Sequence, residues 1–276
     1  MRSRTVTTLT LESIEQYRSW CIARGQSENT AKGYSTDLRM MLNFYQTQMI
    51  QTENFETKAQ NWLNKTRQAS SPKTTGRRLT SLRSFARWAK IEVEDLREYK
   101  APVPARALPH PLPEGLSGIE RLLSVAGNPE QRALVGACGL VGLRVAEALA
   151  FKTGWLDARE MLLRVRGKGD KERIVPVSPR AWDAIHIAYI KAMSGDGYLI
   201  HYPDRSARKC ITSLGRKAGL MRTISSHDLR ATYATIMSDQ GVNIRVIQEL
   251  LGHSSVATTE IYTGVGMSAL KEAVNF

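Results

Sequence analysis

Six side chains in the second half of the chain together offer two guanidinium groups, one ammonium, two imidazoles and one phenol. They are Arg144, Lys168, His227, Arg230, His253 and Tyr262. Gathered in one place, the nitrogen-bearing groups would form an anion site, with the phenol as a nucleophile inside it. A cationic pocket favours the phenolate and so lowers the pKa of a phenol from about 10. Such a site suits phosphoryl transfer, which needs mainly placement of the reacting atoms and compensation of spreading charge.

The first arginine of this set lies in "GLVGLRVAEAL", which reads as an apolar helical stretch. A buried guanidinium is unfavourable unless it is paired, so the head of Arg144 must meet an anion or leave the core. Glu147 lies three residues later, on the same predicted helical face, where it can hold the arginine. The pair predicts either part of an anion site or an internal structural ion pair.

The stretch "SSHDLRATYATIM" predicts a helix that Ser225 or Ser226 caps. His227 and Arg230 follow in its first turn, three residues apart and on one face. A helix N-terminus with a histidine and an arginine beside it is a natural phosphate site. The alternative for His227 is a capping or core histidine.

A β-hairpin is predicted from Leu162 to Val177, where side chains alternate on both sides of a glycine turn. The turn "RGKGDKER" places Lys168 between two glycines, and Lys171 and Arg173 add positive charge nearby. Taken alone, this is also a common basic hairpin tip.

The nucleophile candidate follows the last strong helical pattern. That helix ends at Gly252, His253 comes next, and Tyr262 follows nine residues later on a short helix or turn. A single tyrosine is usually a core or surface residue. The whole order (Arg, Lys, His-x-x-Arg, His, Tyr) is far more specific than any of its parts.

The composition favours a partner with negative charge. The 276 residues include 39 Lys and Arg against 26 Asp and Glu, a formal net charge of +13. Such an excess favours a nucleic acid as partner. No apolar run of about 18 residues predicts a membrane span, and the N-terminus lacks the apolar block of a secretory signal. Three widely spaced cysteines are typical of reduced thiols in the cytoplasm, and neither a P-loop nor a carboxylate metal cluster is visible.

A proline-rich stretch over residues 100–115, "KAPVPARALPHPLPEG", predicts an extended linker because proline fixes φ and removes amide donors. It separates residues 8–99, which read as helices throughout, from residues 116–276, which mix helices with the hairpin. The expected fold class is therefore mainly α with a small antiparallel β-sheet (α+β), in two domains.

Four helices are predicted in the N-terminal domain: Leu11 to Gly25, one that Ser27 caps, Phe55 to Thr66, and one over residues 73–90. The last contains no acidic residue, although a solvated face usually mixes both signs. This pattern favours a DNA-facing helix whose cations follow the phosphates, with an ordinary solvated face as the alternative. Its basic residues are Lys73, Arg77, Arg78, Arg83, Arg87 and Lys90.

These motifs resemble the tyrosine recombinases, the integrase and Xer family of site-specific recombinases. The resemblance rests on "GLR" with Glu147, "GKGDKER", "HDLR" followed by "ATYAT", "LLGHSS" and Tyr262. It extends to the N-terminal part, where "SENTAKGYSTDL" and "SPKTTGRRLTSLRSFARW" resemble the helical core-binding domain of the family. The resemblance implies that this domain precedes a catalytic domain and that the two form a clamp around double-stranded DNA.

The resemblance also implies a role for each residue of the set. Tyr262 would attack a DNA phosphodiester, form a 3′-phosphotyrosyl link and free a 5′-hydroxyl. Arg144 and Arg230 would clamp the non-bridging oxygens, with Glu147 orienting the first. Lys168 would protonate the leaving oxygen, and His227 and His253 would support the phosphate. No metal, ATP or other cofactor is implied.

The family further implies a homotetramer on core-type DNA sites and accessory directionality or DNA-bending proteins. The C-terminal tail would dock on a neighbouring protomer or, as the alternative, on its own domain. The short segment before residue 8 predicts a compact phage or mobile-element integrase without an arm-binding domain. A Xer-like resolvase of chromosome or plasmid dimers is the alternative. A non-catalytic DNA-binding regulator and a topoisomerase-like monomer are further alternatives. Ala231 and Val141 depart from frequent family residues, outside the implied catalytic set.

Overall fold

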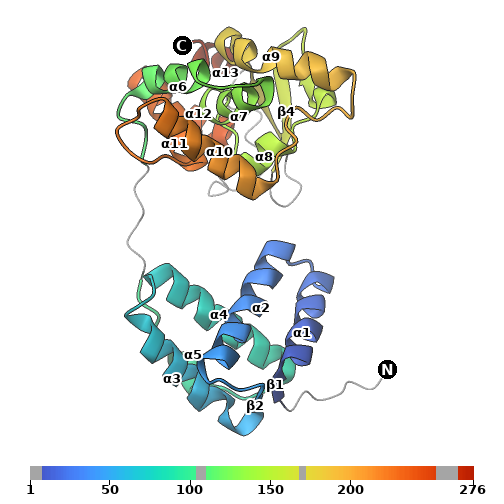
Figure 1. Cartoon of the computed structure of the whole chain (residues 1–276), viewed down its shortest axis with the longest axis vertical. Helices are drawn as coiled ribbons and strands as arrows, with labels where there is room; N and C mark the ends of the chain where they lie inside the picture. The colour runs from blue at the N-terminus through green and yellow to red at the C-terminus, as the bar shows by residue number, and fades with distance from the viewer. Residues whose placement is uncertain (1–7, 104–109, 168–171, 253–266) are drawn as a thin grey trace. The chain divides into compact units, whose positions relative to one another are not determined.

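The computed structural model describes residues 8–103, 110–167, 172–252 and 267–276. The chain divides into two compact units, Met1–Ala107 and Leu108–Phe276. The division falls within the proline-rich stretch over residues 100–115. Figure 1 shows each unit as a bundle of helices with a small sheet.

The N-terminal unit contains helices where the sequence predicts them. Ser27 and Ser71 each accept a hydrogen bond from a backbone amide three residues on, and so begin the second and fourth helices. The core of this unit is aromatic, with Tyr17, Trp62 and Phe85 fully buried. The helices are α1 (Leu11–Ala23), α2 (Glu28–Phe44), α3 (Phe55–Arg67), α4 (Pro72–Ala89) and α5 (Glu94–Glu98).

The prediction that this unit is helical throughout is wrong at one edge. The strands β1 (Thr8–Thr10) and β2 (Met49–Gln51) pair antiparallel, with Leu9 opposite Ile50. Both of these side chains are buried. The 3₁₀ turn η1 (Thr52–Asn54) leads from β2 into α3.

The C-terminal unit packs helices around the apolar helix α7. Residues 133–139 of α7 are all buried, and α6, α9, α10 and α11 all pack against it. Its helices are α6 (Gly115–Ser124), α7 (Pro129–Gly139), α8 (Val145–Leu149), α9 (Pro179–Met193), α10 (Asp204–Lys217), α11 (Ser226–Asp239), α12 (Ile244–Leu251) and α13 (Met267–Ala273). In the described ranges, no helix is both long and apolar enough to cross a membrane.

The two strands of the predicted hairpin are confirmed and belong to a three-stranded antiparallel sheet, whereas residues 168–171 of its turn lie outside the described residues. Strands β4 (Leu162–Arg166) and β5 (Glu172–Pro176) pair along their length, with Val165 opposite Arg173. The short strand β3 (Leu156–Asp157), which follows the 3₁₀ turn η2 (Thr153–Trp155), adds to the other edge of β4. The fold is mainly α with two small antiparallel sheets, in agreement with the predicted class.

The helix predicted to carry Arg144 is interrupted before it reaches that residue. Gly142 has φ +73°, and a Cβ there would lie 2.5 Å from the ring of Tyr233. The chain therefore turns sharply, and Arg144 is the N-cap residue of the separate helix α8. The apolar helical stretch predicted around Arg144 is therefore divided between α7 and α8.

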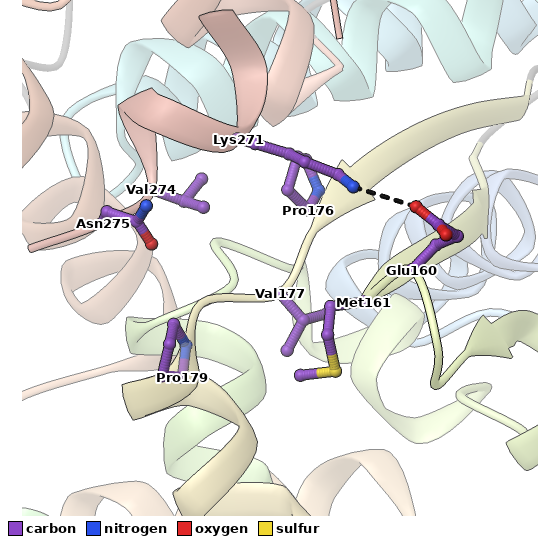
Figure 2. A pocket seen from close by; sticks show the side chains of 8 residues that line it. All are labelled: Glu160, Met161, Pro176, Val177, Pro179, Lys271, Val274 and Asn275. Carbon is purple, nitrogen blue, oxygen red and sulfur yellow. Dashed lines mark hydrogen bonds and ion pairs between the residues drawn. The ribbon is translucent and has the colours of Figure 1, made fainter. Parts of the chain in front are cut away.

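The C-terminal helix α13 packs on its own unit, against α12 and β5. Leu270 and Val274 are buried, and Lys271 donates a hydrogen bond to Glu160 at 3.1 Å. A pocket lies at this contact, lined by Met161, Pro176, Val177 and Val274 among others (Figure 2).

Candidate active site

A buried carboxylate, Glu147, lies at the centre of the candidate site, hydrogen-bonded to two arginines and close to a third. It is only 6% exposed. One of its oxygens accepts from the backbone amide of Arg144 at 2.8 Å, which begins α8, and the other accepts from the guanidinium of the same residue at 2.9 Å. The predicted pairing of Arg144 with Glu147 is therefore present, although it caps a helix rather than lying along one.

The second arginine of the cluster is Arg173, which the sequence did not place in the site. It extends from β5 and donates to both oxygens of Glu147, at 3.0 and 2.9 Å, in a bidentate pair. Its Nε donates to the carbonyl oxygen of Leu250 at 2.8 Å. The strand pattern contains a signal for it, since Arg173 shares the inward face of β5 with the buried Val175. A buried arginine on an inward face needs a partner.

The third arginine, Arg230, lies in α11 and is almost fully buried. Its Nη1 lies 3.8 Å from Glu147 Oε2 and donates to the carbonyl of Gly142, while Nη2 donates to the carbonyl of Leu251. Burial, followed by the positive charge of Arg144, lowers the pKa of Arg230 from 12.5 to about 10. The group remains charged at neutral pH, in surroundings that favour an anion.

Three consecutive carbonyl groups at the end of α12 each accept from a different arginine. Arg173 binds Leu250 O, Arg230 binds Leu251 O, and Arg144 binds Gly252 O at 3.1 Å. These carbonyls are the free acceptors of a helix C-terminus, and they carry its partial negative charge. The arginine cluster therefore fixes the point at which the chain leaves α12, immediately before His253.

The charge of this cluster is unbalanced. Three guanidinium groups share one carboxylate, which leaves two positive charges in excess among these four residues. Burial alone would raise the pKa of Glu147, but the hydrogen bonds and charge of Arg173, followed by those of Arg144, bring it down to about 2. Because Arg144 is 40% exposed along its side chain, the excess charge is open to an anion from outside.

The remaining predicted residues divide between exposed positions and undescribed ones. His227 lies exposed in the first turn of α11. The backbone amide and hydroxyl of Ser225 both donate to Asp228, so Ser225, the first of the two predicted caps, begins the helix. Lys168, His253 and Tyr262 lie outside the described residues. The structure thus brings together Arg144, Glu147 and Arg230, and adds Arg173.

The basic residues of α4 do not all lie on one exposed face. Arg78 is buried, with its guanidinium 4.9 Å from the ring centre of Trp62. Arg83 donates to three backbone carbonyls at the end of α5. Arg77 is exposed, but it donates to the buried Asp37 at 2.6 Å. Lys73, Arg87 and Lys90 are exposed.

Within the part of the chain that the structure describes, no three His, Cys, Asp or Glu side chains are grouped so that they could hold a metal ion. The chemistry available to the cluster is that of fixed cationic hydrogen-bond donors. Arginine forks match the oxygens of phosphate in spacing and direction.

Comparison with known proteins identifies the family of the chain. The model of the phage integrase family matches residues 117–268, and the model of the phage integrase N-terminal SAM-like domain matches residues 14–92. Tyrosine recombinase XerC of Corynebacterium efficiens is 32% identical, over 95% of this chain and 90% of the relative. Tyrosine recombinase XerA of Thermococcus onnurineus is 33% identical, over 95% of this chain and 94% of the relative.

A crystal structure of a lambda integrase tetramer bound to a Holliday junction has the same fold. Its TM-score is 0.68 at 16% identity, over 94% of this chain and 82% of that one. The chain belongs to the phage integrase family and is an enzyme of the tyrosine recombinase type.

Proposed function

We propose that this protein cleaves and rejoins DNA strands at specific sites, through a 3′-phosphotyrosyl intermediate on Tyr262. The observation that carries the proposal is the excess of two positive charges in the cluster of Arg144, Arg173, Arg230 and Glu147. A scissile phosphodiester placed against Arg144 and Arg230 would reduce that excess, and its developing charge would meet donors that are already in position.

The reaction needs no external energy source, because the energy of the broken phosphodiester bond is kept in the phosphotyrosyl bond. The phenol oxygen of Tyr262 attacks phosphorus, the bond from phosphorus to the 5′-oxygen breaks, and Lys168 gives a proton to that oxygen. The phenol proton passes to a base, for which His227 is the candidate. Attack by the 5′-hydroxyl of another strand reverses each step and frees Tyr262.

The position of the cluster supports this assignment. Its arginines bind the last carbonyls of α12, and His253 is the next residue along the chain. His227 lies in the first turn of α11, the helix that also carries Arg230. The N-terminus of α11 adds a partial positive charge that suits a phosphate.

Binding of duplex DNA is proposed to involve the exposed cations of α4. Lys73, Arg87 and Lys90 are exposed and can face phosphates, and Arg77 is partly exposed although it pairs with Asp37. Arg78 and Arg83 bind within their own unit. The protein would act as a homotetramer on two core-type sites, as the lambda integrase complex is a tetramer on a junction. Its place of action would be the cytoplasm, on nucleoid DNA. Directionality or DNA-bending proteins would assist it.

A covalent-adduct assay tests the chemistry. Nicked DNA that carries a candidate site traps the intermediate, because the short cleaved strand diffuses away, and the adduct is seen on a denaturing gel. Tyr262→Phe should abolish the adduct and leave DNA binding intact, and Arg230→Ala should slow its formation by about 10² to 10³-fold. Tyr198→Phe, on the same unit beside Lys152, is the matched control and should react normally. Adduct formation by the Tyr262→Phe variant would refute the assignment of the nucleophile.

Two biological roles fit this chemistry. One is integration of a phage or mobile element, as the name of the matched phage integrase family suggests. The near full-length match to XerC and XerA favours resolution of chromosome or plasmid dimers. Plasmid substrates separate the two roles: an integrase joins two different sites between molecules, whereas a resolvase acts on two like sites within one dimer.

A further inference from the structure

We propose that Arg173 is a positioning residue of the active site, which acts through Glu147 and the end of α12 on Arg144 and Arg230. This inference rests on the proposed function. It gives a role to a residue whose side chain donates three hydrogen bonds inside the cluster, whereas the side chains of Arg144 and Arg230 each donate two.

The hydrogen-bond donors of Arg173 bind groups of the protein and not the substrate. Its Nε, Nη1 and Nη2 each donate one hydrogen bond inside the cluster, to Leu250 O and to the two oxygens of Glu147. The side chain is only 10% exposed. With each of these three nitrogens already engaged, Arg173 offers a phosphate less than the more exposed Arg144 does.

The first effect of Arg173 is on the Glu147 carboxylate. Each oxygen of Glu147 accepts one bond from Arg173 and one from Arg144, which fixes the plane of the carboxylate. Arg230 stays at 3.8 Å from the same group, beyond hydrogen-bond distance. Without Arg173, the carboxylate would be free to turn towards Arg230 and compete with the phosphate for it. Arg173 keeps Glu147 occupied, so that two guanidiniums remain available to an anion.

The second effect is on the segment that leads to His253. Arg173 connects β5 to the end of α12 through Leu250 O. A Cβ added to Gly252 would lie 3.0 Å from both Cδ and Nη1 of Arg173. The side chain thus packs directly under the αL residue that ends α12, and it sets the position from which the next residues start.

Lysine cannot replace this arrangement. A single ammonium on a flexible stem cannot make two parallel bonds to a carboxylate and a third to a carbonyl. Arg173→Lys keeps the charge and removes the fork, so it separates positioning from simple charge compensation.

Single-turnover cleavage of nicked DNA by the full-length protein tests the proposal. The amplitude gives the fraction of active protein and the rate gives the placement of the reacting groups. For Arg173→Lys we expect an unchanged amplitude and DNA affinity, with a rate about 10 to 100-fold lower. The matched control is Arg121→Lys, which loses a guanidinium that holds two backbone carbonyls at the end of α10. It should keep the wild-type rate.

Combination with Arg144→Lys provides the second readout. Because Arg173 acts in part through Arg144, the double variant should cleave faster than the two single effects multiplied together would give, since the effects of coupled residues do not add. A wild-type rate for Arg173→Lys, a loss of amplitude instead of rate, or additive effects in the double variant would each overturn the proposal. Absence of any adduct with the wild-type protein would instead refute the proposed function, so the two failures are distinct.

Discussion

Substitution of Glu147 by glutamine removes the charge of the carboxylate and preserves its shape, so it isolates the charge imbalance of the cluster. The interactions of Arg173 and Arg144 outweigh burial and lower the pKa of Glu147 from 4.5 to about 2. At about 1.4 kcal/mol per unit, the folded protein favours the ionised form by about 3 kcal/mol. Because glutamine resembles the protonated form, Glu147→Gln should lower the free energy of unfolding by about 3 kcal/mol at pH 7.

The pH dependence gives this prediction its sign. A carboxyl whose pKa falls on folding stabilises the protein above its unfolded pKa, and that stabilisation disappears as the pH falls towards its folded pKa. The gap between wild type and Glu147→Gln should therefore be constant above about pH 5 and should narrow as the pH falls from 4.5 towards 2. Urea unfolding followed by far-UV circular dichroism measures the gap at each pH.

A matched control separates this effect from the loss of an ordinary ion pair. Glu120 pairs with Arg180 on the surface, and both side chains are more than a third exposed. Glu120→Gln should change the free energy of unfolding by less than about 1 kcal/mol. A Glu147→Gln variant as stable as this control at pH 7, or a gap that persists unchanged at low pH, would contradict the electrostatic account of the cluster.

Further substitutions test three other parts of the structure. Gly142→Ala should destabilise the protein by more than about 1 kcal/mol, because φ is +73° and the added Cβ meets a buried tyrosine ring. Gly154→Ala, where nothing lies within 4 Å of the added Cβ, should change the melting temperature little. Equal changes of the melting temperature in the two variants would contradict the tight turn at Gly142. Arg83→Ala should lower stability by leaving three carbonyls without their donor, whereas Arg87→Ala should keep stability and make the salt dependence of DNA binding shallower by about one charge. If instead Arg87→Ala lowered stability in urea unfolding and Arg83→Ala made the salt dependence of DNA binding shallower, the assignment of Arg83 to structure and of Arg87 to DNA would be wrong. Leu270→Ala should cost about 2 kcal/mol in dilute protein, because α13 packs on its own unit, and no change would show that this contact is absent in the single chain.

Much of the fold could be predicted because its signals are local. Helices such as α2, α4 and α9 have an apolar face and a serine cap, and the paired strands β4 and β5 have an alternating pattern. The pairing of β1 with β2 was missed because each strand has three residues and its partner lies about 40 residues away. The break before Arg144 was missed because "GLVGLR" continues the apolar helical pattern, and the positive φ of Gly142 depends on its packing against Tyr233.

Only those contacts of the candidate site that join residues close in sequence could be predicted. Arg144 and Glu147 are three residues apart, so their contact was expected. The contact of Arg173 with Glu147 joins residues 26 apart, on a strand and a helix, and depends on how β5 packs beside α8. The basic residues of α4 show the opposite limit. The sequence predicts one basic DNA-facing set, yet Arg78 and Arg83 donate hydrogen bonds to Ser70 and Leu96 of their own unit.

The most direct test of the central claim is to identify the amino acid that becomes joined to DNA. The covalent adduct is digested with protease and nuclease, and the remaining nucleotide-bearing peptide is sequenced by mass spectrometry. We predict that the peptide carries a 3′-linked nucleotide on Tyr262. Attachment to any other residue, or through a 5′-phosphate, would contradict the proposed chemistry of this site.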